Sequence, residues 1–383
     1  MNKLKARVIA YYLPQYHPIP ENNRWWGNGF TEWINVVKAK PLFKGHYQPH
    51  IPSDLGFYDL RLPEVREEQA KMAREAGIEG FCYWRYWFGG KQLLEKPFKE
   101  VLESGKPNFP FCLGWANETW SNKSWHSKSA LLKDKVLIEQ TYSTKDYIEH
   151  FYDVLPALKD ERYIRVDGKP LFIIFNPKGI PDAQEFLNIW RDLSVKEGLS
   201  GIFFVGIVSN ISYEDNRKRV PKTNEVARLY NRILDMGFDG INTRGYARAE
   251  ILLSGKLRKL IQLVLFKLLR ITYVRKFKQK DIIEKVYTEE DRWVNSYPTI
   301  LPNWDRTPRS GKKSVIYTDS TPEVFKQNIE YALDILKNRD DEHKLVFLQS
   351  WNEWGEGNYV EPDQKFGRGY LDVLAESIIE KLD

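Results

Sequence analysis

Eight short apolar segments recur along the chain, and a polar or aromatic segment follows each of them. Most are continuous runs of β-branched and aromatic residues, which is typical of parallel strands that are covered on both faces. Segments with helical periodicity fall between them. The predicted strands are Val8–Leu13, Gly80–Tyr86, Phe109–Trp115, Leu171–Phe175, Gly201–Val208, Phe238–Asn242, Thr299–Pro302 and Leu345–Ser350. The predicted helices are Leu62–Ala76, Phe98–Leu102, Thr144–Leu158, Ala183–Glu197, Asn224–Asp235 and Thr321–Asn338.

This alternation of strands and helices predicts an α/β protein with the (β/α)8 architecture of a TIM barrel. Such a barrel needs about 250 residues, so a chain of 383 residues leaves many for long loops after the strands. An open, doubly wound sheet is the alternative, but no glycine-rich phosphate loop follows any predicted strand. Because there is no internal repeat and no Pro/Ser-rich linker, we predict that residues 1–383 form a single domain.

An insertion at residues 251–295 separates the sixth and seventh predicted strands. Its segment 251–280 has nine basic residues and no acidic one. On a helix, Lys256, Lys259, Lys267 and Arg270 would share one narrow sector beside many leucines. A basic, apolar helix of this kind predicts peripheral contact with an anionic membrane. The alternative is a helix packed on the barrel with a solvated basic edge.

Charge and cysteine content limit the partners and the cellular compartment that we expect for the protein. Lys and Arg number 58 against 52 Asp and Glu, and this balance does not suggest a nucleic-acid partner. Two cysteines, Cys82 and Cys112, are too few for a disulfide scaffold. The basic start of the chain lacks the features of a signal peptide, and no window approaches the roughly 18 apolar residues of a spanning helix. We therefore expect a cytoplasmic protein, with a peripheral position at the inner face of the plasma membrane as an option.

Aromatic residues make up 14% of the chain, and many lie in loop-like segments beside Asn, Asp, Glu or Arg. In a parallel barrel the active site lies at the C-terminal ends of the strands, where these segments fall. Flat apolar rings with polar neighbours suit sugar binding. The predicted substrate-binding residues are Tyr12, Gln15, His17, Trp26, Trp84, Tyr86, Trp115, Asn117, Glu118, Trp120, Asn303, Asp305, Arg309, Trp351, Asn352 and Trp354.

Glu353 and Glu356 are the predicted catalytic residues. Cleavage of a glycosidic bond needs two carboxyl groups, one to protonate the leaving oxygen and one to assist displacement at the anomeric carbon. Two glutamates three residues apart just past a strand can reach one cavity if the chain turns, and Gly355 and Gly357 permit that turn. The alternative is a pair of surface glutamates. The histidines show no metal-binding spacing such as H-E-x-x-H, so we predict no metal and no cofactor.

Six segments of the chain form distinctive motifs: Tyr11–Pro18 (YYLPQYHP), Gly29–Trp33 (GFTEW), Trp115–Glu118 (WANE), Trp351–Gly357 (WNEWGEG), Glu361–Asp363 (EPD) and Gly367–Tyr370 (GRGY). Together they resemble the WbsX family, which is related to glycoside hydrolase family 99, and the resemblance covers nearly the whole chain. WbsX members commonly accompany bacterial genes for surface-polysaccharide biosynthesis and are often described as glycosyltransferases. The characterised family 99 enzymes are retaining, endo-acting α-mannan hydrolases with a (β/α)8 barrel.

The resemblance to family 99 implies a role for each glutamate. Glu353 would deprotonate the 2-hydroxyl of the sugar to give a 1,2-anhydro intermediate, and Glu356 would act as acid and then as base. After Trp120, many relatives continue with a short Arg- or Gly-containing turn and a second Trp, whereas Ser121–His126 intervenes here.

We expect an enzyme that cleaves glycosidic bonds with retention in a bacterial surface polysaccharide (O-antigen or capsule) or a lipid-linked oligosaccharide. A glycosyltransferase or transglycosylase of lipopolysaccharide or polysaccharide biosynthesis is the alternative. A third possibility is an inactive glycan-binding protein, against which the intact Glu353 and Glu356 argue.

Overall fold

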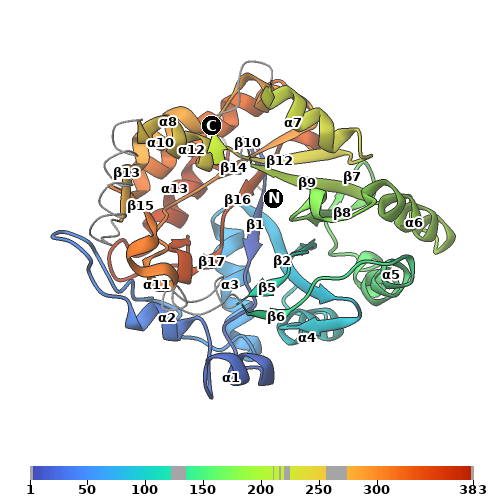
Figure 1. Ribbon diagram of the computed structural model, residues 1–383, viewed down its shortest axis with the longest axis horizontal. Helices are drawn as coiled ribbons and strands as arrows, with labels where there is room; N and C mark the ends of the chain where they lie inside the picture. The colour runs from blue at the N-terminus through green and yellow to red at the C-terminus, as the bar shows by residue number, and fades with distance from the viewer. Residues whose placement is uncertain are drawn as a thin grey trace.

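Eight parallel strands close into a barrel in the computed structural model of the chain (Figure 1). They are β1 (Arg7–Tyr12), β2 (Ile78–Phe88), β4 (Phe111–Trp115), β8 (Lys169–Ile174), β9 (Phe203–Ser209), β12 (Gly240–Arg244), β14 (Ser296–Ile300) and β16 (Leu345–Leu348). Each pairs in parallel with the next, and β1 pairs with both β2 and β16, which closes the ring. The predicted (β/α)8 fold is therefore confirmed. The structure describes residues 3–121, 135–209, 211–214, 217–219, 225–255 and 274–380.

At least one helix follows each barrel strand, and these helices form the outer layer (Figure 1). Side chains of Ser143, Asp182 and Thr321 accept hydrogen bonds from the first turns of three of them, which fixes where those helices begin. All six predicted helices are present. The outer helices are α3 (Pro63–Glu75), α4 (Lys96–Ser104), α5 (Thr144–Leu158), α6 (Ala183–Lys196), α7 (Glu225–Leu234), α8 (Tyr246–Ser254), α10 (Gln279–Val286), α12 (Pro322–Leu336) and α13 (Gly369–Ile378).

Shorter elements occupy the connections. The helices are α1 (Pro20–Trp26), α2 (Trp33–Lys38), α11 (Thr307–Ser310) and the 3-10 turns η3 (Pro177–Gly179), η4 (Glu289–Arg292), η5 (Gly311–Lys313), η6 (Asp341–His343) and η7 (Trp354–Glu356). The strands are β3 (Lys91–Leu93), β5 (Trp120–Ser121), β6 (Val136–Ile138), β7 (Arg165–Val166), β10 (Ser212–Glu214), β11 (Arg217–Arg219), β13 (Arg275–Lys278), β15 (Val315–Thr318), β17 (Asn352–Glu353) and β18 (Asn358–Tyr359).

The insertion at 251–295 lies between β12 and β14, as predicted, but the segment 251–280 is not one continuous helix. Its residues Arg275–Lys278 form β13, which pairs in parallel with β15. Phe277 is buried while its neighbours on β13 are exposed, an alternation that suits a strand on the surface of the barrel. The prediction of a helix is therefore wrong for this part. Lys256, Lys259, Lys267 and Arg270 lie outside the described residues.

Polar groups form a hydrogen-bonded layer inside the barrel. The Tyr11 hydroxyl donates to Asn242 Oδ1 across the interior at 2.9 Å. Asn242 Nδ2 in turn donates to Tyr297 O at 3.0 Å and to Thr299 Oγ1 at 2.8 Å. The Trp84 ring stacks on Tyr11, with the ring centroids 4.8 Å apart. Because side chains alternate along a strand, these residues identify the inward-facing positions of β1, β2 and β12.

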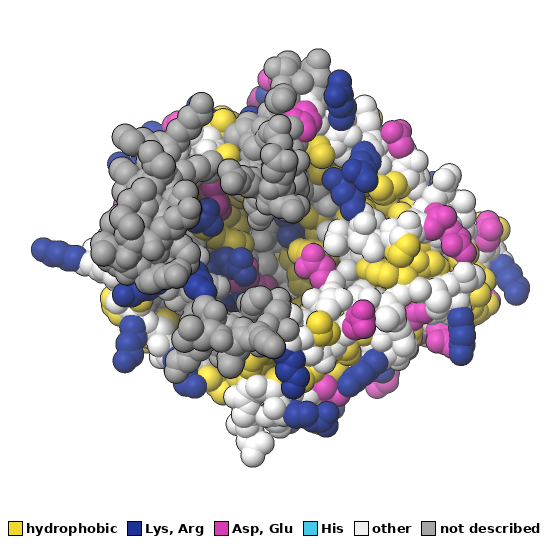
Figure 2. All heavy atoms as spheres, in the orientation of Figure 1, with side chains coloured by type: hydrophobic (Ala, Val, Ile, Leu, Met, Phe, Trp, Pro, Cys, Tyr) yellow, Lys and Arg dark blue, Asp and Glu magenta, His cyan; other side chains and the backbone are white. Residues whose placement is uncertain are grey.

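The loops after the strands surround a hollow. Figure 2 shows this hollow over the centre of the barrel, with hydrophobic and basic side chains visible inside it. We call it the mouth of the barrel, the end where TIM-barrel enzymes carry their active sites. Within the residues described, no helix has the length and apolar character needed to cross a lipid bilayer.

Candidate active site

Glu353 and Glu356 lie on the loop that follows β16. Glu353 ends the short strand β17, and Glu356 ends the turn η7. Gly357 then adopts a left-handed conformation with a φ of 59°, which residues with a side chain rarely adopt. The chain thus turns sharply, and the two carboxyl groups meet at a single arginine.

That arginine, Arg309 on α11, contacts three glutamates with its three guanidinium nitrogens. Nη2 lies 2.5 Å from Glu353 Oε1, and Nη1 lies 2.9 Å from Glu356 Oε1. Nε donates to Glu32 Oε2 at 2.9 Å. The exposed fraction is 7% for the Arg309 side chain and 0% for that of Glu32. A shared cation with little access to water holds together carboxylates that would otherwise repel one another.

A glycine is required where the loop passes over this arginine. A Cβ atom added at Gly355 would overlap Glu32 Oε2 and lie 2.9 Å from Arg309 Nε. Close approach of the backbone is one of the few roles that glycine alone can fill. Gly355 therefore allows Glu32 and Arg309 to reach beneath the loop that carries the two glutamates.

A second arginine contacts one member of the pair. Arg306 Nη2 lies 2.7 Å from Glu356 Oε1, and the Arg306 side chain is 39% exposed. Its guanidinium also lies 5.9 Å from the ring centroid of Trp304. Glu356 thus faces two cations, whereas Glu353 contacts Arg309.

This asymmetry separates the pKa values of the two glutamates. Burial raises the pKa of Glu353 to about 7, although Arg309 opposes the rise. Burial also acts on Glu356, but Arg306 and Arg309 outweigh it and lower the pKa of Glu356 below its ordinary value. Near neutral pH the pair therefore holds one partly protonated and one ionised carboxyl group, the division of roles that acid–base chemistry uses.

Two buried tyrosines lie next to the pair. Tyr16 donates its hydroxyl proton to Asn352 O at 2.6 Å and accepts from Trp354 N at 3.1 Å. The Tyr86 hydroxyl accepts a hydrogen bond from Gln15 Nε2 at 3.2 Å. Burial chiefly, together with the negative charge of Glu353, raises the pKa of both tyrosines. Both hydroxyls thus remain neutral near the carboxylates.

The predicted substrate-binding residues fall into groups. Trp26 and Trp84 are half-buried, and Glu118 is exposed on the loop after β4. Trp84 stacks inside the barrel on Tyr11. Partial loss of hydration raises the pKa of Glu118. All three residues keep solvent-accessible surface.

Three other predicted residues have side chains held in the protein interior. The Tyr12 hydroxyl donates to Gln69 Oε1 on α3 at 2.6 Å, because Tyr12 faces the opposite side of β1 from Tyr11. Trp115 is fully buried, and its Nε1 donates to Trp87 O at 3.1 Å. Trp351 is fully buried as well. These three rings have almost no accessible surface to stack on a bound sugar.

Three predicted asparagines tie loops together. Asn117 exchanges two hydrogen bonds with the backbone of Asn176, joining the loops after β4 and β8. Asn352 makes the same double contact with the backbone of Leu13, which fixes the loop after β16 to the end of β1. Asn303 Oδ1 accepts from Tyr359 N at 3.1 Å. These contacts hold the walls of the mouth in place.

Asp305, His17 and Trp120 are also buried. Asp305 Oδ2 lies 2.7 Å from His46 Nε2 and accepts from Gln48 Nε2 at 2.7 Å. These hydrogen bonds outweigh burial and lower the pKa of Asp305. Burial lowers the pKa of His17. The ring of Trp120 packs edge-on against that of Tyr86, at a centroid distance of 4.9 Å.

Glu361 is a buried carboxyl group to which the sequence analysis assigned no role. It accepts hydrogen bonds from Trp354 Nε1 at 2.6 Å, Gln69 Nε2 at 2.6 Å and Tyr58 Oη at 2.8 Å. Burial raises the pKa of Glu361 to about 7. The ring of Trp354 is therefore fixed behind the pair. Glu32 and Glu361 both lie in the family-like segments, which was the one signal that pointed to them.

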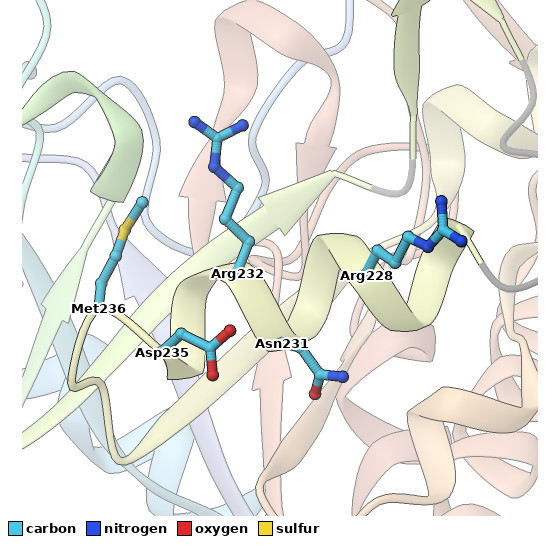
Figure 3. Close-up of a pocket in the computed structure, with 5 residues that line it drawn as sticks. All are labelled: Arg228, Asn231, Arg232, Asp235 and Met236. Atoms are coloured by element: carbon cyan, nitrogen blue, oxygen red, sulfur yellow. The ribbon is translucent and has the colours of Figure 1, made fainter.

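The described residues outside the mouth include a surface pocket but no cluster suited to a metal ion. Among those residues, no group of three or more His, Cys, Asp or Glu side chains could hold a metal ion. A shallow pocket lies on α7 and the two residues after it (Figure 3), and its volume is about 410 Å³. It lies in the outer helical layer and contains none of the predicted site residues. Its lining residues are Arg228, Asn231, Arg232, Asp235 and Met236.

Solved structures with the same fold include a glycoside hydrolase-like protein, with a TM-score of 0.58 and 15% identity over 99% of this chain and 95% of the other. Another is the family 99 endo-α-mannosidase from Bacteroides thetaiotaomicron. It has a TM-score of 0.57 and 15% identity, and the match covers 97% of this chain and 95% of that one.

Two strains of Xanthomonas campestris pv. campestris have a relative named uncharacterized protein WxcX, 32% identical over 394 residues. The match covers 99% of this chain and 50% of the relative, so the chain spans about half the length of these curated relatives. A sequence model of the family described as Glycosyltransferase WbsX matches residues 8–374. The chain belongs to the WbsX glycosyltransferase family, as its sequence motifs predicted.

Proposed function

We propose that Glu353 and Glu356 cleave a glycosidic bond with retention in a bacterial surface polysaccharide or a lipid-linked oligosaccharide. The observation that carries the proposal is their shared contact with the buried guanidinium of Arg309 at the mouth of the barrel. Two carboxyl groups held together at one site are what this reaction requires. Half-buried rings such as Trp84 supply flat faces for a sugar.

The roles follow from the resemblance to family 99. Glu353 takes the proton of the sugar 2-hydroxyl, whose oxygen then attacks the anomeric carbon to give a 1,2-anhydro sugar. Glu356 gives a proton to the leaving oxygen and later takes one from the incoming water. In the unbound protein, the lowered pKa of Glu356 favours its ionised form. For Glu356 to carry the proton, the bound substrate has to offset the effect of Arg306 and Arg309, and Arg306, at 39% exposed, is the more accessible of the two.

The test compares the wild type with Glu353→Gln and Glu356→Gln on a panel of bacterial surface polysaccharides and lipid-linked oligosaccharides. We expect both variants to lose turnover of any glycan that the wild type cleaves, while they still bind it. The first product should keep the anomeric configuration of the substrate, as followed by NMR. Wild-type rates in both variants would end the assignment.

A second candidate function is glycosyl transfer, which the description of the family favours. The same pair could pass the sugar to another sugar in place of water. Product analysis with and without an added acceptor separates the two reactions. A glycan-binding protein without activity is the third candidate, and it predicts binding with no turnover in either experiment.

We also propose that the segment 251–280 brings the enzyme to the anionic inner face of the plasma membrane. Its described part includes Arg275, Lys276 and Lys278, which are exposed on β13. Flotation with anionic liposomes tests this, with a variant in which the nine basic residues are replaced by Gln. We expect the wild type to float and the variant to stay with the lipid-free fraction. Equal distribution of the two proteins would contradict the proposal.

A further inference from the structure

Arg244 is a cation at the mouth of the barrel. It is the last residue of β12 and lies two positions after Asn242. The side chain of Asn242 points into the barrel. Side chains alternate along a strand, so Arg244 points inward one layer closer to the mouth. Its guanidinium carbon lies 4.7 Å from the ring centroid of Tyr11 and 5.8 Å from that of Phe175.

Arg244 is half-buried, and no carboxylate among the described residues forms an ion pair with it. Its polar contact is with the Tyr11 hydroxyl, while its buried Nε and Nη2 make no hydrogen bond to a described residue. The other arginines at the mouth differ, since Arg306 and Arg309 are bound to glutamates. Withdrawing a guanidinium from water without an anionic partner is unfavourable. An arginine kept in this state is suited to receive its partner from a ligand.

The surroundings of Arg244 fit a sugar with an attached anion. Trp84 is half-buried and lies on the Tyr11 ring, with the two ring planes 6° apart. The ring of Phe175 meets Trp84 edge-on at 5.6 Å. Aromatic faces beside a guanidinium allow a sugar ring to stack while its charged substituent binds two nitrogens at once. Figure 2 shows basic side chains within the same hollow.

We infer that the glycan bound at the mouth carries an anionic substituent, a carboxylate or a phosphate, and that Arg244 binds it. This inference rests on the proposed function only in that the mouth binds a glycan. Guanidinium groups bind both anions through paired N–H donors. A carboxylate would come from a uronic acid in the polymer, and a phosphate from a phosphorylated or lipid-linked precursor.

The test measures binding of monosaccharides, which have no glycosidic bond to cleave. Glucuronic, galacturonic and mannuronic acids and glucose 1-phosphate are titrated against glucose, galactose and mannose, by protein-observed NMR and calorimetry. The variants are Arg244→Gln and Arg244→Lys, and Arg248→Gln on α8 is the matched control. We expect at least one acidic sugar to bind the wild type tenfold or more tightly than its neutral parent. Arg244→Gln should abolish this preference, Arg244→Lys should keep part of it, and Arg248→Gln should keep all of it.

The preferred anion identifies the source, since a hexuronate indicates an acidic polymer and the sugar phosphate indicates a phosphorylated precursor. Equal binding of acidic and neutral sugars by the wild type would overturn the inference, as would a preference that survives in Arg244→Gln. Arg244→Gln should leave the Tm close to that of the wild type, because the loss of the contacts with the Tyr11 and Phe175 rings is offset by removal of a cation that has no ion-pair partner among the described residues. A marked fall in Tm would assign Arg244 to the fold instead. Failure of Glu353 and Glu356 to support turnover would leave these binding results unchanged, so the two proposals fail separately.

Discussion

Arg309 Nε donates to Glu32 Oε2 at 2.9 Å, although the two residues lie on loops that follow different barrel strands. The Glu32 side chain is 0% exposed, so no substrate can reach it. The same guanidinium contacts Glu353 and Glu356. The position of the proposed catalytic pair therefore depends on a carboxylate that takes no direct part in the reaction. We regard Arg309 and Glu32 as positioning residues.

Arg309→Lys tests this dependence. A lysine ammonium is a compact charge and cannot reproduce a fork that contacts three carboxylates. We expect turnover to fall at least a hundredfold and the free energy of unfolding to fall by about 3 kcal/mol, because buried carboxylates lose their partner. Urea denaturation and a turnover assay measure the two effects. Arg248→Lys, on the outer helix α8, is the control and should match the wild type. An Arg309→Lys variant with wild-type stability would show that the cluster does not need the guanidinium.

The pH dependence of stability tests the raised pKa of Glu353, which burial brings to about 7 in the folded chain. A carboxyl group whose pKa is higher in the folded than in the unfolded chain favours folding at low pH, and this contribution is lost as the pH rises through the folded-state pKa. Glu361, with a pKa raised to about 7, acts in the same direction. We expect the free energy of unfolding of the wild type to fall between pH 5 and pH 8.

The Glu353→Gln variant has no ionisable group at position 353. Its free energy of unfolding should therefore fall less between pH 5 and pH 8 than that of the wild type, by on the order of 1–3 kcal/mol. Glu356 does not produce this effect, because its lowered pKa affects stability only at acidic pH. Glu67→Gln, an exposed position on α3, should keep the wild-type slope. Parallel stability curves for the wild type and Glu353→Gln would mean that Glu353 titrates normally.

Gly355→Ala tests the close approach beneath the catalytic loop. An added Cβ would overlap Glu32 Oε2, and because Gly355 has no positive φ, the clash is the sole cost of the change. We expect a loss of about 2–3 kcal/mol in stability, with loss of turnover. Gly105→Ala is the control, since its Cβ would meet no atom within 4 Å and its φ of 70° costs about 1 kcal/mol. Equal effects of the two substitutions on stability and turnover would exclude a special role for Gly355.

Local patterns were sufficient to predict the barrel, because each strand is an apolar run and six of the outer helices have a helical period of their own. The outer helices α8, α10 and α13 were not predicted. The same patterns also led to the prediction that Glu353 and Glu356 lie close together, and the structure places both carboxyl groups against Arg309. They could not predict the contact of Arg309 with Glu32, since nothing in a linear sequence relates residues brought together by barrel closure. Arg309 was expected to bind substrate, and the structure instead shows its three nitrogens against protein carboxylates.

The prediction of a helix over residues 251–280 is wrong at β13 for a related reason. Arg275–Lys278 contains one apolar residue, Phe277, and a single apolar position fits either a strand or a helix. Pairing with β15, far along the chain, decides between them. The sequence pattern also did not predict which face of a strand each side chain occupies. Tyr11 and Tyr12 face opposite sides of β1.

Leaving-group dependence separates the roles of the two glutamates. A dinitrophenyl leaving group departs without protonation, so a variant that lacks the general acid should keep most of the rate of the first step, the release of dinitrophenolate, on a dinitrophenyl glycoside of a sugar that the wild type cleaves. Because Glu356 also acts as base on the incoming water, the second step is slow in Glu356→Gln, and the release is therefore measured in the first turnover. We expect Glu356→Gln to retain a first-turnover release rate within about tenfold of the wild type and to lose about a thousandfold or more of its turnover on the natural glycan. Glu353→Gln should lose activity on both substrates, because neither reaction proceeds without the base on the 2-hydroxyl. The opposite pattern would assign the acid role to Glu353, in keeping with its raised pKa, and would contradict the roles implied by family 99.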